Sequence, residues 1–222
     1  MTIPDFDQAS LIAFFSQYAY QPGIVYTFII LVMFASSFGL PLPEEITLVS
    51  SGLVAYLAKN PAKFPPPYPG AEPVEVTTLM FVAFFAVFGS DLLVYFIGRI
   101  FGNKVMKSKW MSKYVEGKNY KMIDNWFKKY GSWCCGIFRF TPGIRFPGHL
   151  MCGVLKVPLY TFVMVDGLAA LVSVPTQIYF VATYGEVMLE KMQEFKIVIL
   201  IVLAILAVVW FVRKRIKART SS

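Results

Sequence analysis

Long apolar runs dominate the chain, and the breaks between them divide it into elements. Residues 24–40 are apolar and long enough for most of a membrane crossing. A glycine and two prolines in residues 39–43 then interrupt any helix, before residues 46–58 resume the apolar pattern. This second run rises only about 20 Å as a helix, less than the ~30 Å of a hydrocarbon core. Residues 24–58 therefore predict a re-entrant helical hairpin.

A second interrupted stretch covers residues 131–158. Four helix-breaking residues lie at its centre: Pro142, Gly143, Pro147 and Gly148. Neither half is long enough to span a bilayer, so this stretch predicts a second re-entrant hairpin. Residues 78–101 and 160–184 are continuous apolar runs of spanning length, and each predicts a transmembrane helix.

Polar and amphipathic segments separate these runs. Residues 1–23 mix aspartates with leucine and phenylalanine and predict a short interfacial helix. The proline-rich residues 59–76 predict an extended loop. Residues 102–130 interleave eight lysines with aromatic and aliphatic residues, a pattern typical of an interfacial helix pair. Residues 186–222 predict a last spanning helix followed by a basic tail.

The composition places the chain among integral membrane proteins. Hydrophobic residues make up 57% of the sequence and the mean hydropathy is +0.60, more apolar surface than a soluble globule can bury. The net charge of +8 does not indicate a nucleic-acid-binding protein, because Lys and Arg gather beside apolar runs, in residues 102–130 and 213–219. By the positive-inside rule, both basic segments and the C-terminus face the cytoplasm.

With the basic segments inside, residues 59–76 and 186–196 lie outside, and the two hairpins enter from opposite faces. The expected fold is an all-α integral membrane protein with spanning helices and two opposed re-entrant hairpins related as an inverted repeat. Residues 24–185 form the expected transport domain. Transporters with such repeats place their site near the bilayer midplane, between the discontinuous segments.

Further features of the sequence narrow the prediction. Because the first 58 residues contain no Lys or Arg, no cleavable signal peptide is expected. The three cysteines are odd in number, lie in apolar surroundings and lack paired spacing, so we expect packing residues and no disulfide framework. No metal and no cofactor is predicted, and the oligomeric state stays open, with a homo-oligomer compatible.

Charged residues at membrane depth form the candidate site. An ionised side chain there costs at least ~3 kcal/mol on insertion scales, so each one needs a partner or a water-filled cavity. The first hairpin supplies Glu44 and Glu45, the first spanning helix Asp91, and the second hairpin Arg139 and Arg145. Where the hairpin tips meet, opposite charges would partly neutralise one another and line a polar cavity.

The residue types indicate the chemistry. Guanidinium groups are planar, permanently charged donors that suit phosphate, and desolvated carboxylates take up protons near neutral pH. Simpler interpretations stay open. Arg139 and Arg145 could set topology or anchor headgroups, and the two glutamates could belong to a surface loop. Asp91 and Asp166 could make helix-packing hydrogen bonds, and a lone histidine, His149, is more often structural.

Three segments resemble the DedA family of bacterial inner-membrane proteins, which shares its fold with eukaryotic VTT-domain lipid scramblases. They are GLPLPEEITLVSSGLVA (39–55), GSDLLVYFIGRIFG (89–102) and RFTPGIRFPGHLMCGVLKVPLYTF (139–162). The resemblance implies two facing re-entrant hairpins in the cytoplasmic membrane. It also implies movement of undecaprenyl phosphate or a related phospholipid, driven by the proton-motive force.

Residue by residue, the resemblance gives Glu45 and Asp91 the places of the family's acids, and Arg139 and Arg145 those of its arginine pair. Within residues 24–58 the chain departs from the family pattern at two places. Ser36 stands where many members carry a further glutamate, and Glu44 stands where Gly or Ser is frequent. The second carboxylate could have moved to Glu44, or the coupling to protons could differ.

The predicted function is a lipid-phosphate translocase that binds phosphate through the arginines and protons through Glu44, Glu45 and Asp91. An intramembrane enzyme is not expected, because one histidine cannot supply the usual pair of a phosphatase. An aspartyl protease would need Asp91 and Asp166 together, and the two are expected near different faces. Two further functions stay open: a structural or assembly factor, and a phospholipid scramblase without proton coupling.

Overall fold

The computed structural model describes residues 8–37, 44–106, 118–141 and 144–187, which form helices and their connections, including a loop at 60–75, with no strand among them. The helices are α1 (Gln8–Ala19), α2 (Pro22–Ser36), α3 (Glu44–Lys59), α4 (Val76–Met106), α6 (Lys118–Tyr130), the 3₁₀ turn η1 (Gly131–Trp133), α7 (Cys134–Arg139), α8 (Arg145–Val154) and an unlabelled helix, Leu159–Val187. The expected all-α fold is thus confirmed for these residues. The predicted last spanning helix and basic tail lie almost entirely outside them.

Among the described residues, two helices are long and apolar enough to cross a membrane, Val76–Gly102 within α4 and Leu159–Val187. The shorter has 27 residues and rises about 40 Å, which exceeds a hydrocarbon core. They contain the two stretches predicted to span. Ile12–Ala19 and Pro22–Ser36 would make a third crossing only as one broken span, because they meet at 108°.

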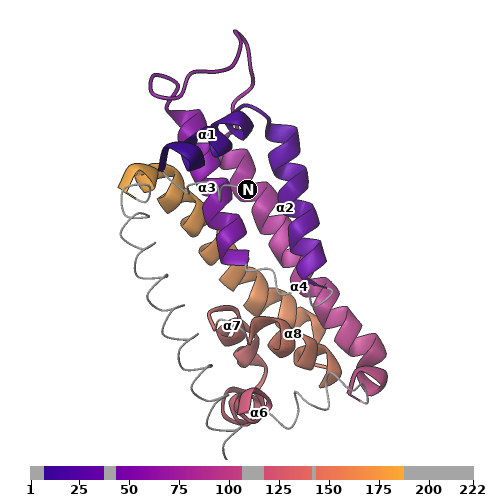
Figure 1. Ribbon diagram of the computed structural model, residues 1–222. Coiled ribbons are helices and arrows are strands. Elements are labelled where there is room, and N and C mark those ends of the chain that lie inside the picture. Colours follow the sequence, from indigo (N-terminus) through magenta and orange to yellow (C-terminus); the bar gives the residue numbers. More distant parts are fainter. Residues whose placement is uncertain (1–7, 38–43, 107–117, 142–143, 188–222) are drawn as a thin grey trace, which may run out of the picture.

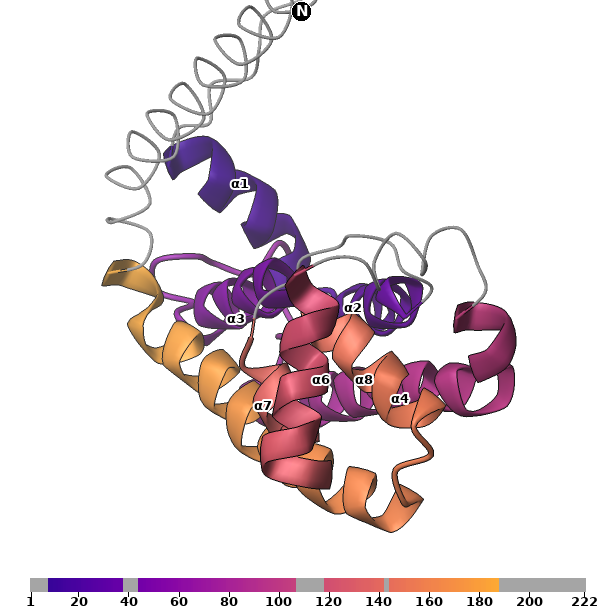
Figure 2. The same ribbon diagram turned by 90° about the horizontal axis from the view of Figure 1, so that it is seen from below.

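The long helices run along the whole molecule, and the short ones occupy its two halves (Figure 1). In that view α2 and α3 lie together in the upper half, whereas α7 and α8 lie in the lower half. Seen from below, α6 lies in front of α7 and α8 (Figure 2). Between these halves, Glu44 at the start of α3 contacts Arg145 at the start of α8.

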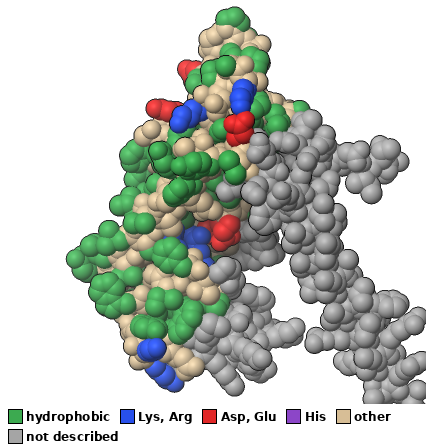
Figure 3. Space-filling view, turned by 90° about the vertical axis from the view of Figure 1, so that its left-hand side faces the viewer, with side chains coloured by type: hydrophobic (Ala, Val, Ile, Leu, Met, Phe, Trp, Pro, Cys, Tyr) green, Lys and Arg blue, Asp and Glu red, His purple; other side chains and the backbone are tan. Residues whose placement is uncertain are grey.

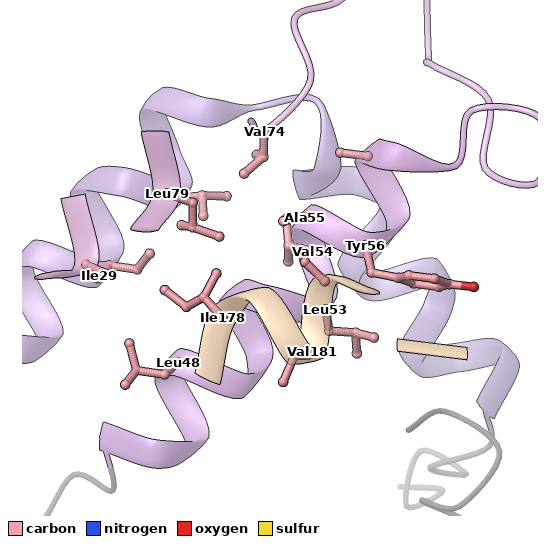
Figure 4. Close-up of a cluster of buried hydrophobic side chains, with 14 of the residues drawn as sticks. Ile29, Leu48, Leu53, Val54, Ala55, Tyr56, Val74, Leu79, Ile178 and Val181 are labelled. Atoms are coloured by element: carbon pink, nitrogen blue, oxygen red, sulfur yellow. The ribbon is translucent and has the colours of Figure 1, made fainter. Parts of the chain in front are cut away.

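The upper half is held by an apolar core between the first hairpin and the long helices (Figure 4). Three residues are fully buried in this core: Ile29 of α2, Leu79 of α4 and Ile178 of the Leu159–Val187 helix. Gly52 of α3 lets that helix approach closely, because a Cβ built there would lie 2.8 Å from the Cβ of Val181. Small residues at such crossings allow backbones to meet.

In the lower half, α8 packs against α4 through two glycines. A Cβ on Gly98 would lie 2.1 Å from the carbonyl oxygen of Leu150, and one on Gly153 would lie 2.0 Å from that of Tyr95. No side chain fits at either position, so the two backbones touch. This contact fixes the height of α8 along α4, and with it the height of the polar side chains near the start of α8.

The break between α7 and α8 contains fewer residues than we predicted. Pro147 and Gly148, predicted at its centre, lie inside α8, so that part of the prediction is wrong. Pro147 is the third residue of the helix, where proline is tolerated because the first amides have no intrahelical acceptor. Gly148 is required by packing, since a Cβ there would lie 2.5 Å from the ring of Phe138.

Beneath this break, α6 covers α7. Ile123 of α6 is fully buried, and Trp126 stacks on Phe138 with ring centroids 5.7 Å apart. Cys135 and Cys152 are buried beside them as free thiols, with their Sγ atoms 2.9 Å apart. α6 is the one helix described within residues 107–130 of the connector, which we predicted as an interfacial helix pair. Residues 107–117 lie outside the described part of the chain.

Candidate functional site

Asp91 lies at the centre of a buried ion-pair cluster between the two halves of the molecule. Its Oδ2 accepts hydrogen bonds from Arg139 Nη1 at 2.6 Å and from Arg145 Nη2 at 2.8 Å. Its Oδ1 accepts from Arg145 Nη2 at 3.0 Å and lies 3.0 Å from His149 Nδ1. One carboxylate on α4 thus engages an arginine of α7 and an arginine of α8.

Arg139 is the last residue of α7, and its side chain is only 3% exposed. Besides Asp91, its Nη1 contacts Asp166 Oδ1 at 2.8 Å, and its Nε donates to Ser173 Oγ at 3.3 Å. A cation at a helix C-terminus also interacts favourably with the helix dipole. Arg139 therefore ties α7 to α4 and to the Leu159–Val187 helix.

Arg145 joins α8 to α3. It is the first residue of α8, and its Nη1 forms an ion pair with Glu44 Oε2, on the first residue of α3. The positive end of a helix dipole disfavours the arginine and favours the glutamate. Arg145 consequently depends on Asp91 and Glu44 for compensation at its position.

Glu44 also contacts the residue that marks the departure from the DedA pattern. Ser36 Oγ at the end of α2 donates to Glu44 Oε1 at 3.4 Å and to the carbonyl oxygen of Met33 at 2.8 Å. The carboxylate of Glu44 therefore occupies the space beside the position where the family resemblance implies a further glutamate.

Glu45 stands apart from the cluster. It is exposed, and within the described residues no ion pair involves it. It does line the same pocket as Glu44 and both arginines. The structure thus brings together Glu44, Asp91, Arg139 and Arg145 by direct contact, and places Glu45 at the edge.

The pocket has a volume of about 240 Å³ and lies between the start of α3, the end of α7, the start of α8 and the Leu159–Val187 helix. Nine residues line it: Glu44, Glu45, Leu48, Arg139, Phe140, Arg145, Ser173, Val174 and Gln177. Figure 3 shows acidic and basic side chains next to each other at mid-height of a largely hydrophobic surface. A polar opening at that height would lie within the apolar layer of a bilayer.

Two cluster members were not selected from the sequence. His149 and Asp166 are both fully buried, and His149 Nε2 lies 3.4 Å from Asp166 Oδ1. His149 comes four residues after Arg145, and this helical spacing puts both side chains on one face of α8. The expectation that Asp91 and Asp166 lie near different faces is wrong, because both contact Arg139 Nη1.

Ligand atoms of Asp91, His149 and Asp166 lie within 4.8 Å of one another, a spacing that a metal ion could exploit. The carboxylates, however, already accept from Arg139 at 2.6 and 2.8 Å. A dication placed there would have to displace that guanidinium group. The donor set is therefore better suited to ion pairing.

The fold and this cluster define a helical membrane protein with a buried polar site between broken helices. Residues 42–183 match the family model of the VTT domain, which covers more than half of the chain. The chain belongs to this family, which includes the DedA proteins, so the resemblance found in the sequence is confirmed.

Curated relatives carry similar sequences. An uncharacterized membrane protein of Haemophilus influenzae is 33% identical over 170 residues, covering 76% of this chain and 72% of the relative. Undecaprenyl phosphate transporter A of Staphylococcus aureus is 27% identical over 56% of each chain. The protein of the same name from Bacillus subtilis is 28% identical over 41% of this chain and 45% of the relative. No solved structure matches significantly.

Proposed function

We propose that this protein moves a phosphate-bearing lipid, undecaprenyl phosphate or a related phospholipid, across the bacterial cytoplasmic membrane and couples the movement to protons. The observation that carries the proposal is the pocket lined by Arg139, Arg145 and Glu44. The names of the two transporter relatives support the lipid class, although the chain spans only about half of each.

In this proposal α2 with α3 and α7 with α8 are re-entrant hairpins that enter the membrane from opposite faces as an inverted repeat. The proposal draws on the two long helices, which are long enough to cross the membrane beside them. The basic connector and the C-terminus then face the cytoplasm. A lipid would keep its chains in the bilayer while its headgroup passes the pocket.

Arg145 would bind the phosphate in exchange for Glu44. Asp91 keeps Nε and Nη2 of Arg145 occupied, whereas Nη1 pairs with Glu44 at the pocket. Protonation of Glu44 would remove its charge and release Nη1 for a phosphate oxygen. Arg139 also lines the pocket and adds a second positive charge to it.

This exchange of Glu44 for phosphate at Arg145 links proton binding to lipid binding. With Glu44 ionised, Arg145 has two carboxylate partners and little affinity left for a phosphate. With Glu44 protonated, the site gains a positive charge that the phosphate can neutralise. Glu45, exposed at the pocket edge, would act as the accessible acid that passes protons to Glu44.

The test is transport in proteoliposomes containing undecaprenyl phosphate. An impermeant phosphatase outside releases inorganic phosphate only from outer-leaflet lipid, so transport appears as release beyond the outer-leaflet amount. Arg145→Lys keeps one charge but loses the planar fork, and we expect at least a tenfold slower rate. Glu186→Gln, an exposed carboxylate on the last helix, is the matched control. Equal rates for wild type and Arg145→Lys would refute the proposal.

A second candidate function, a structural or assembly factor, is favoured by one specific observation. Each arginine already has two carboxylate partners, Asp91 and Asp166 for Arg139, and Asp91 and Glu44 for Arg145. Charges that neutralise one another this fully could serve only to hold the helices. Exchanging the charges of Glu44 and Arg145 in one double variant separates the two functions.

A further inference from the structure

His149 faces one carboxylate with each of its ring nitrogens. Nδ1 lies 3.0 Å from Asp91 Oδ1, and Nε2 lies 3.4 Å from Asp166 Oδ1. The side chains of His149 and Asp166 are 0% exposed and that of Asp91 is 4% exposed. Bulk water therefore cannot compensate for a missing hydrogen bond at any of the three.

A neutral imidazole cannot satisfy this geometry. It has one N–H donor and one acceptor nitrogen. If Nδ1 carries the hydrogen and donates to Asp91, the lone pair of Nε2 faces the anionic Oδ1 of Asp166. The other tautomer puts a lone pair against Asp91 instead. In agreement, neither His149 Nε2 nor Asp166 Oδ2 has a hydrogen-bond partner within the described residues.

The charge of the cluster is unbalanced in the same direction. Three carboxylates, on Glu44, Asp91 and Asp166, face two guanidinium groups, on Arg139 and Arg145. With a neutral histidine, this buried group carries one excess negative charge. Excess charge away from water is costly, and one additional proton removes it.

The other groups packed around His149 do not supply the positive charge that would balance the excess carboxylate. From α7, Arg139 contacts Asp166 Oδ1 and Asp91, and Cys135 faces Cys152 of α8. From its own helix, Arg145 is directed to Asp91 and Glu44. From the Leu159–Val187 helix, the ring of Phe162 packs edge to face against the imidazole, with ring centroids 5.4 Å apart and ring planes at 87°. This aromatic face holds the ring in place between the acids.

We propose that His149 and Asp166 form a proton-binding site in which one proton is held between His149 Nε2 and Asp166 Oδ1. The proton comes from water, and its binding makes both ring nitrogens hydrogen-bonded and the cluster neutral. This site is distinct from the pocket-lining acids Glu44 and Glu45. Its existence does not depend on transport, whereas a role in proton coupling rests on the proposed function.

His149 is the only histidine of the chain, so its protonation can be observed directly. The full-length protein, purified with a tag that lacks histidine, is labelled with ¹⁵N in the imidazole ring and studied by solid-state NMR in lipid bilayers from about pH 5 to 8. We expect a hydrogen-bonded or protonated Nε2 at neutral pH. An Nε2 signal typical of an unprotonated, non-bonded nitrogen throughout this range would overturn the proposal.

Asp166→Asn tests the partner. It removes the carboxylate while keeping the shape, and we expect a neutral ring with a single N–H at neutral pH. Glu186→Gln on the same helix is the matched control and should leave the spectrum unchanged. If Asp166→Asn does not fold, the wild-type pH series still decides. Stoichiometric Zn²⁺ that shifts the His149 signals would instead assign a metal site and overturn the proton site.

A second readout separates this site from transport. If His149→Gln transports lipid with the same pH dependence as wild type, the proton of this site has no part in coupling. If wild type transports no lipid at all, the proposed function fails, but the NMR result for His149 stands.

Discussion

Arg145 on α8 and Glu44 on α3 form an ion pair although 101 positions separate them in the chain. The pair connects α3 and α8 at the pocket, while Asp91 holds Arg145 from the side of α4. The side chains of Arg145 and Glu44 are each 15% exposed, whereas Asp91 is 4% exposed. Glu44 is therefore the partner of Arg145 that protons and ligands can reach most easily.

Glu44→Gln should make lipid binding independent of pH. In the wild type, Arg145 Nη1 becomes available when Glu44 is protonated, so binding of undecaprenyl phosphate in nanodiscs should be at least threefold tighter at about pH 6 than at about pH 8. Glutamine has no charge to lose, so the variant should bind equally at both values. The same pH ratio in wild type and variant would show that Glu44 is not the proton acceptor.

Exchanging the charges of Glu44 and Arg145 should separate a binding site from a structural pair. The double variant Glu44→Arg with Arg145→Glu retains an ion pair across the hairpins, so its melting temperature should exceed that of either single variant. Transport should nevertheless stay at background, because the guanidinium group has moved to α3 and no longer faces Asp91. Recovery of transport to near the wild-type rate would favour the assembly-factor function.

Asp91→Asn should destabilise the fold strongly. The substitution leaves two buried arginines without their shared carboxylate, and breaking a buried ion pair costs about 3–5 kcal/mol. The expected results are a lower melting temperature in detergent and less monodisperse protein in size-exclusion chromatography. Glu45→Gln is the matched control, since Glu45 is exposed, and it should melt as the wild type does. Equal melting of both variants would contradict the buried cluster.

Gly153→Ala should loosen α8 from α4. The new methyl group would lie 2.0 Å from the carbonyl oxygen of Tyr95, so the helices must separate. Overpacking of this kind costs about 1–3 kcal/mol or more, and it also moves Arg145 and His149 away from Asp91. Thermal unfolding measures the first effect and transport the second. Gly23→Ala, with no atom within 4 Å of its Cβ position, should change neither.

The helices could be predicted from the sequence because each depends on local patterns. Apolar runs of spanning length located α4 and the Leu159–Val187 helix, and proline with glycine located both breaks. The extent of the second break was missed at Pro147, since a proline can also begin a helix. Sequence alone does not tell which of these two roles a proline takes.

The charged residues were found because ionised groups are rare at membrane depth, but their partners were not. The family likeness favoured Glu45, whereas the structure pairs Arg145 with Glu44. Adjacent residues of a helix point about 100° apart, so this choice depends on the rotation of α3. The partners of Asp166 and His149 could not be predicted, because their contacts join four separate helices.

We propose that a phosphate-bearing lipid and a proton share the pocket lined by Glu44, Arg139 and Arg145. Lipid transport in proteoliposomes, with and without an imposed pH gradient, tests this for wild type and Arg145→Lys. We expect wild-type transport to accelerate with the gradient and to return to the lower rate when a protonophore is added, and we expect the variant to be at least tenfold slower. Transport that ignores both the gradient and the substitution would contradict this proposal.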